Sequence, residues 1–208
     1  RQVFGRVGID SVAGPSEILV VADNRNKPGH IAADLLSQAE HDPSSQAVLI
    51  TDDKDFAEQV EAAVNGQLSG SPRAEIARAA WRDNSAIILV RHFSEAPALI
   101  DAIAPEHLEL AVDSPEEFAA GVRHAGAIFL GRMAPETIGD YLAGPNHVLP
   151  TSGAARYASG LSTLSFMKRS SLIGADAAAL ATIGPAAVTL AEAEGLPSHA
   201  ASVRLRLD

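Results

Sequence analysis

Short apolar runs alternate with helix-patterned segments between residues 17 and 131, and this alternation constrains the fold more than any other feature of the sequence. The apolar runs predict strands at 17–23, 46–52, 85–92, 107–113 and 127–131. The segments between them predict helices at 29–42, 55–70, 73–84, 94–104 and 114–126. Solidly apolar strands are typical of a parallel sheet that helices cover on both faces. The sequence therefore predicts an α/β fold.

The pattern changes toward the C-terminus. Residues 151–172 are rich in small and hydroxyl side chains, which predicts a loop with a short strand. Residues 174–196 have a helical pattern that we expect to break at Gly184-Pro185, because proline interrupts helical hydrogen bonding. Residues 197–208 then predict a last short helix or strand.

This change of pattern divides the chain into two predicted parts. The α/β domain is expected to cover residues 1–150, and a small helical C-terminal extension is expected to cover residues 151–208. The extension has too few large apolar residues to build a core of its own. We therefore expect it to pack on another surface, such as a second subunit.

Composition excludes several classes of function. The net charge of −10 argues against a nucleic-acid partner, because a phosphate backbone needs a basic surface. Apolar runs stay below the roughly 18–20 residues that span a bilayer, so we expect no membrane partner. The sequence has no cysteine, which excludes disulfides, thiolate zinc sites and a cysteine nucleophile. The cytoplasm is the expected compartment.

The predicted helix at 29–42 ends in two polar residues on its inward face. Gln38 falls in line with Ile31 and Leu35, and His41 follows three residues later. Side chains three apart on a helix lie close enough to share a ligand. The alternative is a buried amide with ordinary hydrogen bonds, beside a histidine that interacts with the negative end of the helix dipole.

Glu106 and His107 stand side by side where a predicted helix gives way to a strand. An adjacent acid and imidazole suit general acid–base catalysis, because one can activate water while the other moves a substrate proton. The alternative is a pair without a common target, since consecutive residues of a strand point to opposite faces.

Asp140 and His147, with Asn146 between them, surround the turn Gly144-Pro145. Loops beyond the strands of an α/β sheet are common places for binding and catalytic residues. Aspartate and asparagine also stabilise turns without any further role, and that interpretation stays open.

Three more polar residues are candidates on weaker local patterns. Glu194 and His199 flank a Gly-Leu-Pro break, and Ser16 lies in a Gly-Pro loop that enters the first strand. The alternatives are a helix end with an exposed histidine and an ordinary turn serine. The sequence contains no G-x-G-x-x-G fingerprint between a strand and a helix, and no P-loop pattern.

Six motifs in order make the chain resemble the histidinol dehydrogenase family. They are GPSEILVVAD, ADLLSQAEHDP, APEHLEL, GDYLAGPNHVLPTSGAARYASGLS, MKRSS and EGLPSHAASVRLR, and together they extend over the whole sequence. The resemblance implies a homodimeric, zinc-containing enzyme of Rossmann-like fold that oxidises L-histidinol to L-histidine through histidinal. Two hydrides would pass to NAD.

The same resemblance assigns roles to the candidates. Zinc would be held by Gln38, His41, Asp140 and His199. Glu106 and His107 would be the catalytic acid–base pair. Substrate would be bound by Ser16, His147 and Glu194 together with His107 and the four zinc ligands. The tail would cross to a partner subunit, so that Glu194 and His199 complete the partner's site.

Length departs from the family, whose chain is about twice as long. The other half of a family member carries a second Rossmann-like domain and the main NAD contacts, so no NAD-binding residue is assigned here. The sequence also lacks an initiator methionine, and we expect a piece of a longer polypeptide, with a processed chain as the alternative. Alone, it is expected to bind metal poorly and not to turn over.

Two other functions remain open at this point. A related alcohol or diol dehydrogenase could use the same scaffold for another substrate, although Glu194 and His199 suit an imidazole and an amine. A non-catalytic metal-binding fragment that dimerises through its tail is the second alternative.

Overall fold

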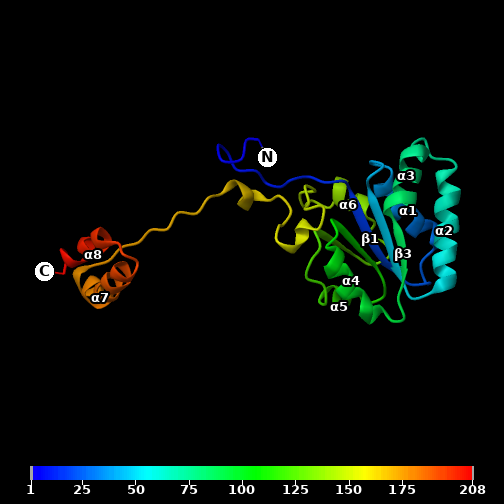
Figure 1. The fold of residues 1–208 in the computed structure, drawn as a ribbon. Coiled ribbons are helices and arrows are strands. Elements are labelled where there is room, and N and C mark those ends of the chain that lie inside the picture. Colours follow the sequence, from blue (N-terminus) through cyan, green and yellow to red (C-terminus); the bar gives the residue numbers. More distant parts are fainter. Residues whose placement is uncertain (1, 208) are drawn as a thin grey trace. The chain divides into compact units, whose positions relative to one another are not determined.

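The computed structural model describes residues 2–207 of the 208-residue chain. The chain divides into two compact units, residues 1–166 and residues 167–208, and each is described by itself (Figure 1). The first unit holds the sheet and its helices, and the second is a pair of helices.

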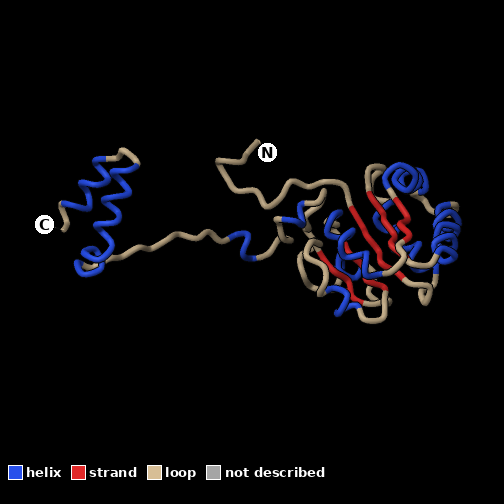
Figure 2. Tube along the Cα trace, turned by 60° about the horizontal axis from the view of Figure 1, so that its bottom comes forward, coloured by secondary structure: helices blue, strands red, loops and turns tan. Residues whose placement is uncertain are grey.

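The first unit is built on one sheet of five parallel strands in the order β3-β2-β1-β4-β5 (Figure 2). The strands are β1 (Glu17–Ala22), β2 (Gln46–Thr51), β3 (Ala86–Leu89), β4 (His107–Ala111) and β5 (Ala127–Leu130). All five lie within the segments that the apolar runs predict. The α/β fold with a parallel sheet is therefore confirmed.

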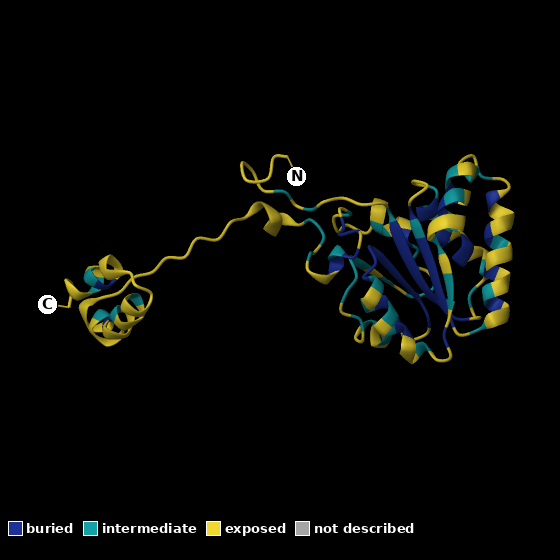
Figure 3. Ribbon diagram, in the orientation of Figure 1, coloured by how far each residue is buried: buried dark blue, intermediate teal, exposed yellow. Residues whose placement is uncertain are grey.

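Helices cover both faces of this sheet. One face packs against α1 (Pro28–Ala39), α2 (Lys54–Leu68) and α3 (Ala74–Asn84), and the other against α4 (Ala96–Ile103) and α5 (Pro115–Ala119). Alternate residues of β1 supply the two cores, with Val20 on the α1 side and Val21 on the α4 side. The central strands are therefore buried on both faces, as Figure 3 shows.

The chain reverses direction across the sheet between β1 and β4. It first adds β2 and β3 on one side of β1, and then returns to place β4 and β5 on the other. At the carboxyl ends of β1 and β4, Arg132 pairs with Asp23 at 2.5 Å and with Asp113 at 2.7 Å, and Arg25 also pairs with Asp113. Ion pairs therefore occupy the edge where open α/β sheets usually bind ligands.

The helical layer on the α1 side carries the chain's single tryptophan. Trp81 lies in α3, partly buried, and packs against the core formed with α1 and α2. In α1 the buried face runs through Ile31 and Leu35 to Gln38, which is 3% exposed. The inward orientation that the helical spacing predicts for Gln38 is therefore observed.

Several segments differ from their predictions. Within residues 151–172 the structure has two short 3-10 helices, at Ala154–Arg156 and Thr163–Phe166, in place of a strand. The loop predicted around Gly144-Pro145, over residues 139–153, begins inside the helix α6 (Glu136–Tyr141). Helix α5 is also shorter than the predicted 114–126, because the chain turns at Gly121 before it enters β5.

The first unit extends to residue 166, beyond the domain boundary that the sequence predicts after residue 150. Hydrogen bonds explain the attachment of the next residues. The amide of Gly14 donates to Thr151 Oγ1 at 2.6 Å, and the amide of Ser152 donates to Glu17 Oε1 at 2.7 Å. These contacts tie the chain after 150 to the entrance of β1.

The second unit is a hairpin of α7 (Ala177–Ala193) and α8 (Pro197–Arg204). Helix α7 continues through Pro185, so the predicted break at Gly184-Pro185 is wrong. Gly184 is buried where Val203 of α8 approaches it, and an added Cβ would lie 3.1 Å from that side chain. Most other residues of this unit are exposed (Figure 3), in agreement with a tail that has little core of its own.

Among residues 2–207, no helix combines the length and the apolar character that crossing a membrane requires.

Candidate active site

Strands β1 and β4 lie next to each other in the sheet, and the residues at which they begin form the centre of the site. Glu17 opens β1, and His107, which opens β4, pairs with Ile18 in the register. Glu106 Oε2 accepts from the Glu17 amide at 3.0 Å, and Glu17 Oε2 accepts from the Glu106 amide at 3.3 Å. The two carboxyl groups therefore cap each other's strand, at the amino edge of the sheet.

Burial changes the acidity of Glu106. Together with the charges of Glu17 and Glu136, burial raises the pKa of the Glu106 carboxyl to about 7, against the opposing effect of the hydrogen bond from the Glu17 amide. A carboxyl group with this pKa exchanges its proton near neutral pH, which is what a general base or acid requires.

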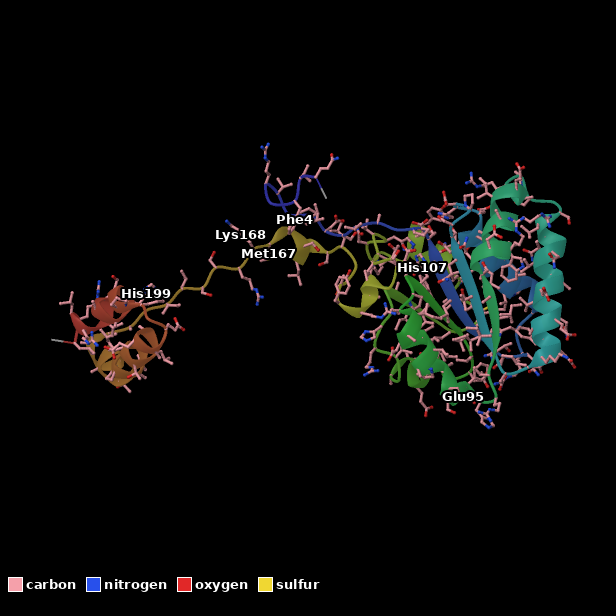
Figure 4. The ribbon with its side chains drawn as sticks, in the orientation of Figure 1. Phe4, Glu95, His107, Met167, Lys168 and His199 are labelled. Carbon is pink, nitrogen blue, oxygen red and sulfur yellow. The ribbon has the colours of Figure 1, made fainter. Side chains whose placement is uncertain are left out.

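His107 is fixed in one tautomer. Its Nδ1 donates to the Glu17 carbonyl at 2.7 Å, so Nε2 bears the lone pair. Burial lowers the pKa of His107 to about 4, which leaves the ring neutral at pH 7. Its Nε2 lies 2.9 Å from Nε2 of His147, whose ring stacks on it at 4.8 Å between centroids. Figure 4 shows His107 in the first unit.

A glycine permits the close packing beside Glu106. A Cβ at Gly126 would lie 2.5 Å from the Glu106 carbonyl oxygen, and backbone cannot rotate away as a side chain can. Gly126→Ala is therefore expected to lower the free energy of unfolding by about 1–3 kcal/mol, the usual cost of overpacking. Denaturant unfolding followed by circular dichroism measures this.

The matched control is Gly66→Ala in α2, where an added Cβ meets nothing within 4 Å. That change is expected to leave stability unaltered or to raise it by up to about 1 kcal/mol, because alanine is the better helix former. Equal effects of the two substitutions would contradict the packing argument.

A second carboxyl group lies on the other side of the two histidines. Glu136 is the first residue of α6 and only 3% exposed. Its Oε1 lies 3.0 Å from His147 Nε2 and 3.7 Å from His107 Nε2. Its Oε2 accepts from Gln38 Nε2 at 2.7 Å. One buried carboxylate thus contacts α1, β4 and the loop that carries His147.

Three of the four predicted zinc ligands gather around this centre. Gln38 is in contact with Glu136, and His41 follows Gln38 at the end of α1. Asp140 lies one turn beyond Glu136 on α6 and so shares its face. The charges of Asp140 and His41 both act on the pKa of His107, the first raising it and the second lowering it.

The remaining candidates divide between the units. Ser16 Oγ lies 3.4 Å from His41 Nδ1, so it belongs to the same group. Glu194 and His199 lie in the second unit, Glu194 at the end of α7 and His199 in the first turn of α8, and both are exposed. Figure 4 labels His199 in this unit.

Two groups of residues have the chemistry of a metal site. His107, Glu136 and His147 offer ligand atoms within 4.8 Å of one another. Gln38, His41 and Asp140 offer an amide oxygen, an imidazole and a carboxylate, which suit zinc as nitrogen and oxygen donors. The buried Gln38 Oε1 has no hydrogen-bond partner among residues 2–207. Because a buried acceptor without a partner is costly, this atom favours the second group.

Four acidic residues of the site were missed by the sequence analysis. They are Glu17, Asp34, Glu109 and Glu136. Glu109 lies inside β4 and Asp34 one turn before Gln38 in α1; burial raises the pKa of both, and each acts on the other. The sequence contained a signal for two of them. Glu109 is an acid inside an apolar strand, and Asp34 is a second polar residue on the apolar stripe of α1.

A cavity of about 710 Å³ opens beside His147. It lies along β5 and α6, and its lining includes Phe129 and Asn146. Cavities of this size accept small organic ligands. One wall of the site therefore opens onto space that a small organic molecule could enter.

The whole sequence matches a known family. The family model for histidinol dehydrogenase matches residues 1–207. Curated relatives with the same name come from Rhodospirillum rubrum (63% identical), Caulobacter vibrioides (59%) and Gluconobacter oxydans (58%). Each match covers 100% of this chain and 48% of the relative, so the chain spans about half the length of the curated relatives it matches.

A solved structure gives the same result for the fold. The crystal structure of histidinol dehydrogenase from Elizabethkingia anophelis superposes with a TM-score of 0.90 at 42% sequence identity. The match covers 99% of this chain and 47% of that one.

Proposed function

Because the chain belongs to the histidinol dehydrogenase family, we propose that its residues take part in the zinc-dependent, NAD-linked oxidation of L-histidinol to L-histidine through histidinal. The observation that carries the proposal is the pair Glu106 and His107. One is a carboxyl group with a pKa of about 7, and the other is a neutral imidazole whose Nε2 bears the lone pair. They lie at one buried point, as an oxidation with two separate proton transfers requires.

In the first oxidation, His107 takes the proton of the substrate hydroxyl as the carbon gives up a hydride, for which NAD would be the acceptor when bound. The Nδ1 hydrogen bond to the Glu17 carbonyl supports this role, because it keeps the lone pair on Nε2. The carbonyl also stabilises the imidazolium that forms. The product of this step is the aldehyde histidinal.

In the second oxidation, Glu106 takes a proton from water as the water oxygen bonds to the aldehyde carbon. The aldehyde oxygen takes the proton that His107 gained in the first oxidation, which completes the hydrate. The hydrate then loses a hydride, for which a second NAD would be the acceptor when bound, while one hydroxyl proton passes to His107. The carboxylic acid that results releases its remaining proton to solvent and becomes the carboxylate of histidine. Water is the nucleophile that we propose, since these 208 residues offer no cysteine thiol for covalent catalysis. The raised pKa of Glu106 supports this role, since a stronger base removes a proton from water more readily.

The first unit and the tail share the remaining roles. Gln38, His41, Asp140 and His199 would hold zinc, which when bound orients the imidazole and amine of the substrate. The free Gln38 Oε1 supports the fit. Substrate contacts would come from Ser16, His147 and Glu194, besides His107 and the zinc ligands. We propose that Glu194 and His199 act across a homodimer, which agrees with the small core of their unit.

No residue of this chain is assigned to NAD. The glycine fingerprint of dinucleotide sites is absent from the sequence. We propose that the nicotinamide contacts lie in the half of the family's chain that these 208 residues do not match.

The test is the stoichiometry of histidinol oxidation. The natural protein that contains these residues is expected to form two NADH and one histidine per histidinol, and to lose this activity when a chelator removes its metal. Zinc should restore the activity. The isolated 208 residues are expected to form NADH at least about 100-fold more slowly, because proximity of both reactants is lost.

Other outcomes would select the alternatives. Oxidation of another alcohol or diol in preference to histidinol would indicate a related dehydrogenase. Metal binding without oxidation of any alcohol by the natural protein would indicate a non-catalytic metal-binding protein. Full-rate oxidation by the isolated chain would contradict the assignment of the NAD contacts to another part.

A further inference from the structure

Glu136 is a buried acid that none of the roles above uses. Both of its oxygens have partners: Oε2 accepts from Gln38 at 2.7 Å, and Oε1 lies 3.0 Å from His147 Nε2. Because its two oxygens contact groups from different parts of the fold, the carboxylate cannot rotate freely. It is therefore a fixed acceptor between α1 and the loop that carries His147.

This fixed acceptor determines which way the Gln38 amide points. A carboxylate only accepts hydrogen bonds, so it selects the NH₂ end of the amide and repels the carbonyl end. The Gln38 Oε1 must then face away from Glu136. There it is buried and has no hydrogen-bond partner among the residues that the structure describes. An oxygen held in this way is ready to bind a cation.

The position of Glu136 is itself fixed by packing. It is the first residue of α6, and α6 lies tightly on β5. The close packing is evident at Gly139, where an added Cβ would lie 2.5 Å from the Phe129 ring. Asp140 follows Glu136 by one turn on the same helix. The helix that carries one proposed zinc ligand thus also carries the residue that orients another.

We propose that Glu136 is a positioning residue that turns the Gln38 amide oxygen toward the metal without binding the metal itself. This inference rests on the proposed function, which makes Gln38 a zinc ligand. The competing role is direct ligation, because Glu136 also belongs to the group formed with His107 and His147. Residues that orient metal ligands typically change metal affinity by about 10- to 100-fold when they are lost.

The experiment measures zinc affinity in the natural protein by competition with a chelator, without substrate or NAD. Glu136→Ala is expected to weaken zinc binding about 10- to 100-fold. Glu136→Gln is expected to restore affinity to within about threefold, because its single carbonyl oxygen can still accept from Gln38 Nε2. If Glu136 were a ligand, loss of the carboxylate charge would leave Glu136→Gln nearly as weak as Glu136→Ala.

A double-mutant cycle gives the second measurement. With Gln38→Ala in place, Glu136→Ala is expected to have less than about a threefold further effect, because a residue that acts through Gln38 has nothing left to orient. Multiplicative losses would overturn the proposal. The control is Glu116→Gln, an exposed acid in the first turn of α5, which should not change zinc affinity.

The outcomes separate this inference from the proposed function. If the unmodified protein binds zinc tightly and both Glu136 variants do so as well, the inference is wrong and the proposed function stands. If the unmodified protein binds no zinc, both are wrong. Thermal unfolding of each variant shows whether a loss of zinc affinity is instead a loss of fold. If Glu136→Ala does not fold, the zinc affinity of Glu136→Gln, which keeps the shape of the side chain, decides between positioning and direct ligation.

Discussion

Replacing His107 with asparagine is expected to lower kcat for the oxidation of histidinol to histidinal by about 10²- to 10⁴-fold. Asparagine can still donate to the Glu17 carbonyl, as Nδ1 of His107 does at 2.7 Å. It has no basic nitrogen to receive the hydroxyl proton. The expected loss therefore comes from proton transfer, with the fold preserved. Single-turnover formation of NADH in the natural protein measures this step.

His92→Asn is the matched control for that substitution. His92 is exposed and precedes a short 3-10 helix (Phe93–Glu95) on the α4 side of the sheet. The same change of side chain there should leave kcat within about twofold of the unmodified enzyme, as is usual for surface substitutions. A His107 variant as active as this control would show that another group accepts the proton.

Glu106→Gln is expected to slow the oxidation of histidinal by about 10²- to 10⁴-fold while the oxidation of histidinol continues. The amide oxygen can still accept from the Glu17 amide, but it cannot take a proton from water. Histidinal should therefore accumulate. Supplying histidinal directly and following NADH separates the second oxidation from the first. Equal losses in both oxidations would contradict a separate role for Glu106.

The same variant should change the response of the reaction to pH. Because the pKa of Glu106 is about 7, the rate of histidinal oxidation in the unmodified enzyme should rise as the pH increases through 7 and then level off. Glu106→Gln should lack this rise. Glu61→Gln, an exposed acid in α2, is the control and should keep the profile unchanged.

The stability of the fold should also depend on the pKa of Glu106. It should fall as the pH rises, whereas the rate of histidinal oxidation should increase. Folding raises the pKa of Glu106 from 4.5 to about 7, so the folded state favours the protonated form. The stability gained in this way is fully present below pH 4.5 and is lost as the pH rises through 7. Glu106→Gln is always neutral, so its thermal midpoint should rise relative to the unmodified protein between pH 5 and pH 8.

The fold followed from the sequence because its elements have clear periods. The strands are apolar on both faces and the helices show one apolar stripe, so both can be recognised from local patterns. Helix α6 was missed because it has only six residues and contains Gly139, and a helix that short has almost no period. At Pro185 the sequence predicted a helix break that the structure does not have, since packing of α7 against α8 keeps the helix continuous there.

Only part of the site could be found in the same way. Glu106 and His107 are neighbours in sequence, and in the structure both contact the backbone of Glu17. Glu17 itself carried no local signal. Its importance comes from the pairing of β1 with β4, whose first residues are 90 positions apart. Glu136 likewise depends on the contact between α6 and α1, which no periodicity encodes.

The placement of Trp81 determines what the intrinsic fluorescence of these 208 residues can report. It is the only tryptophan of the sequence, and it lies in the helical layer of the first unit, whereas residues 167–208 contain no tryptophan, tyrosine or phenylalanine. Intrinsic emission therefore follows the loss of packing between α3 and its neighbours. Melting of α7 and α8 would leave the emission unchanged, and only the far-ultraviolet signal of the backbone would record it.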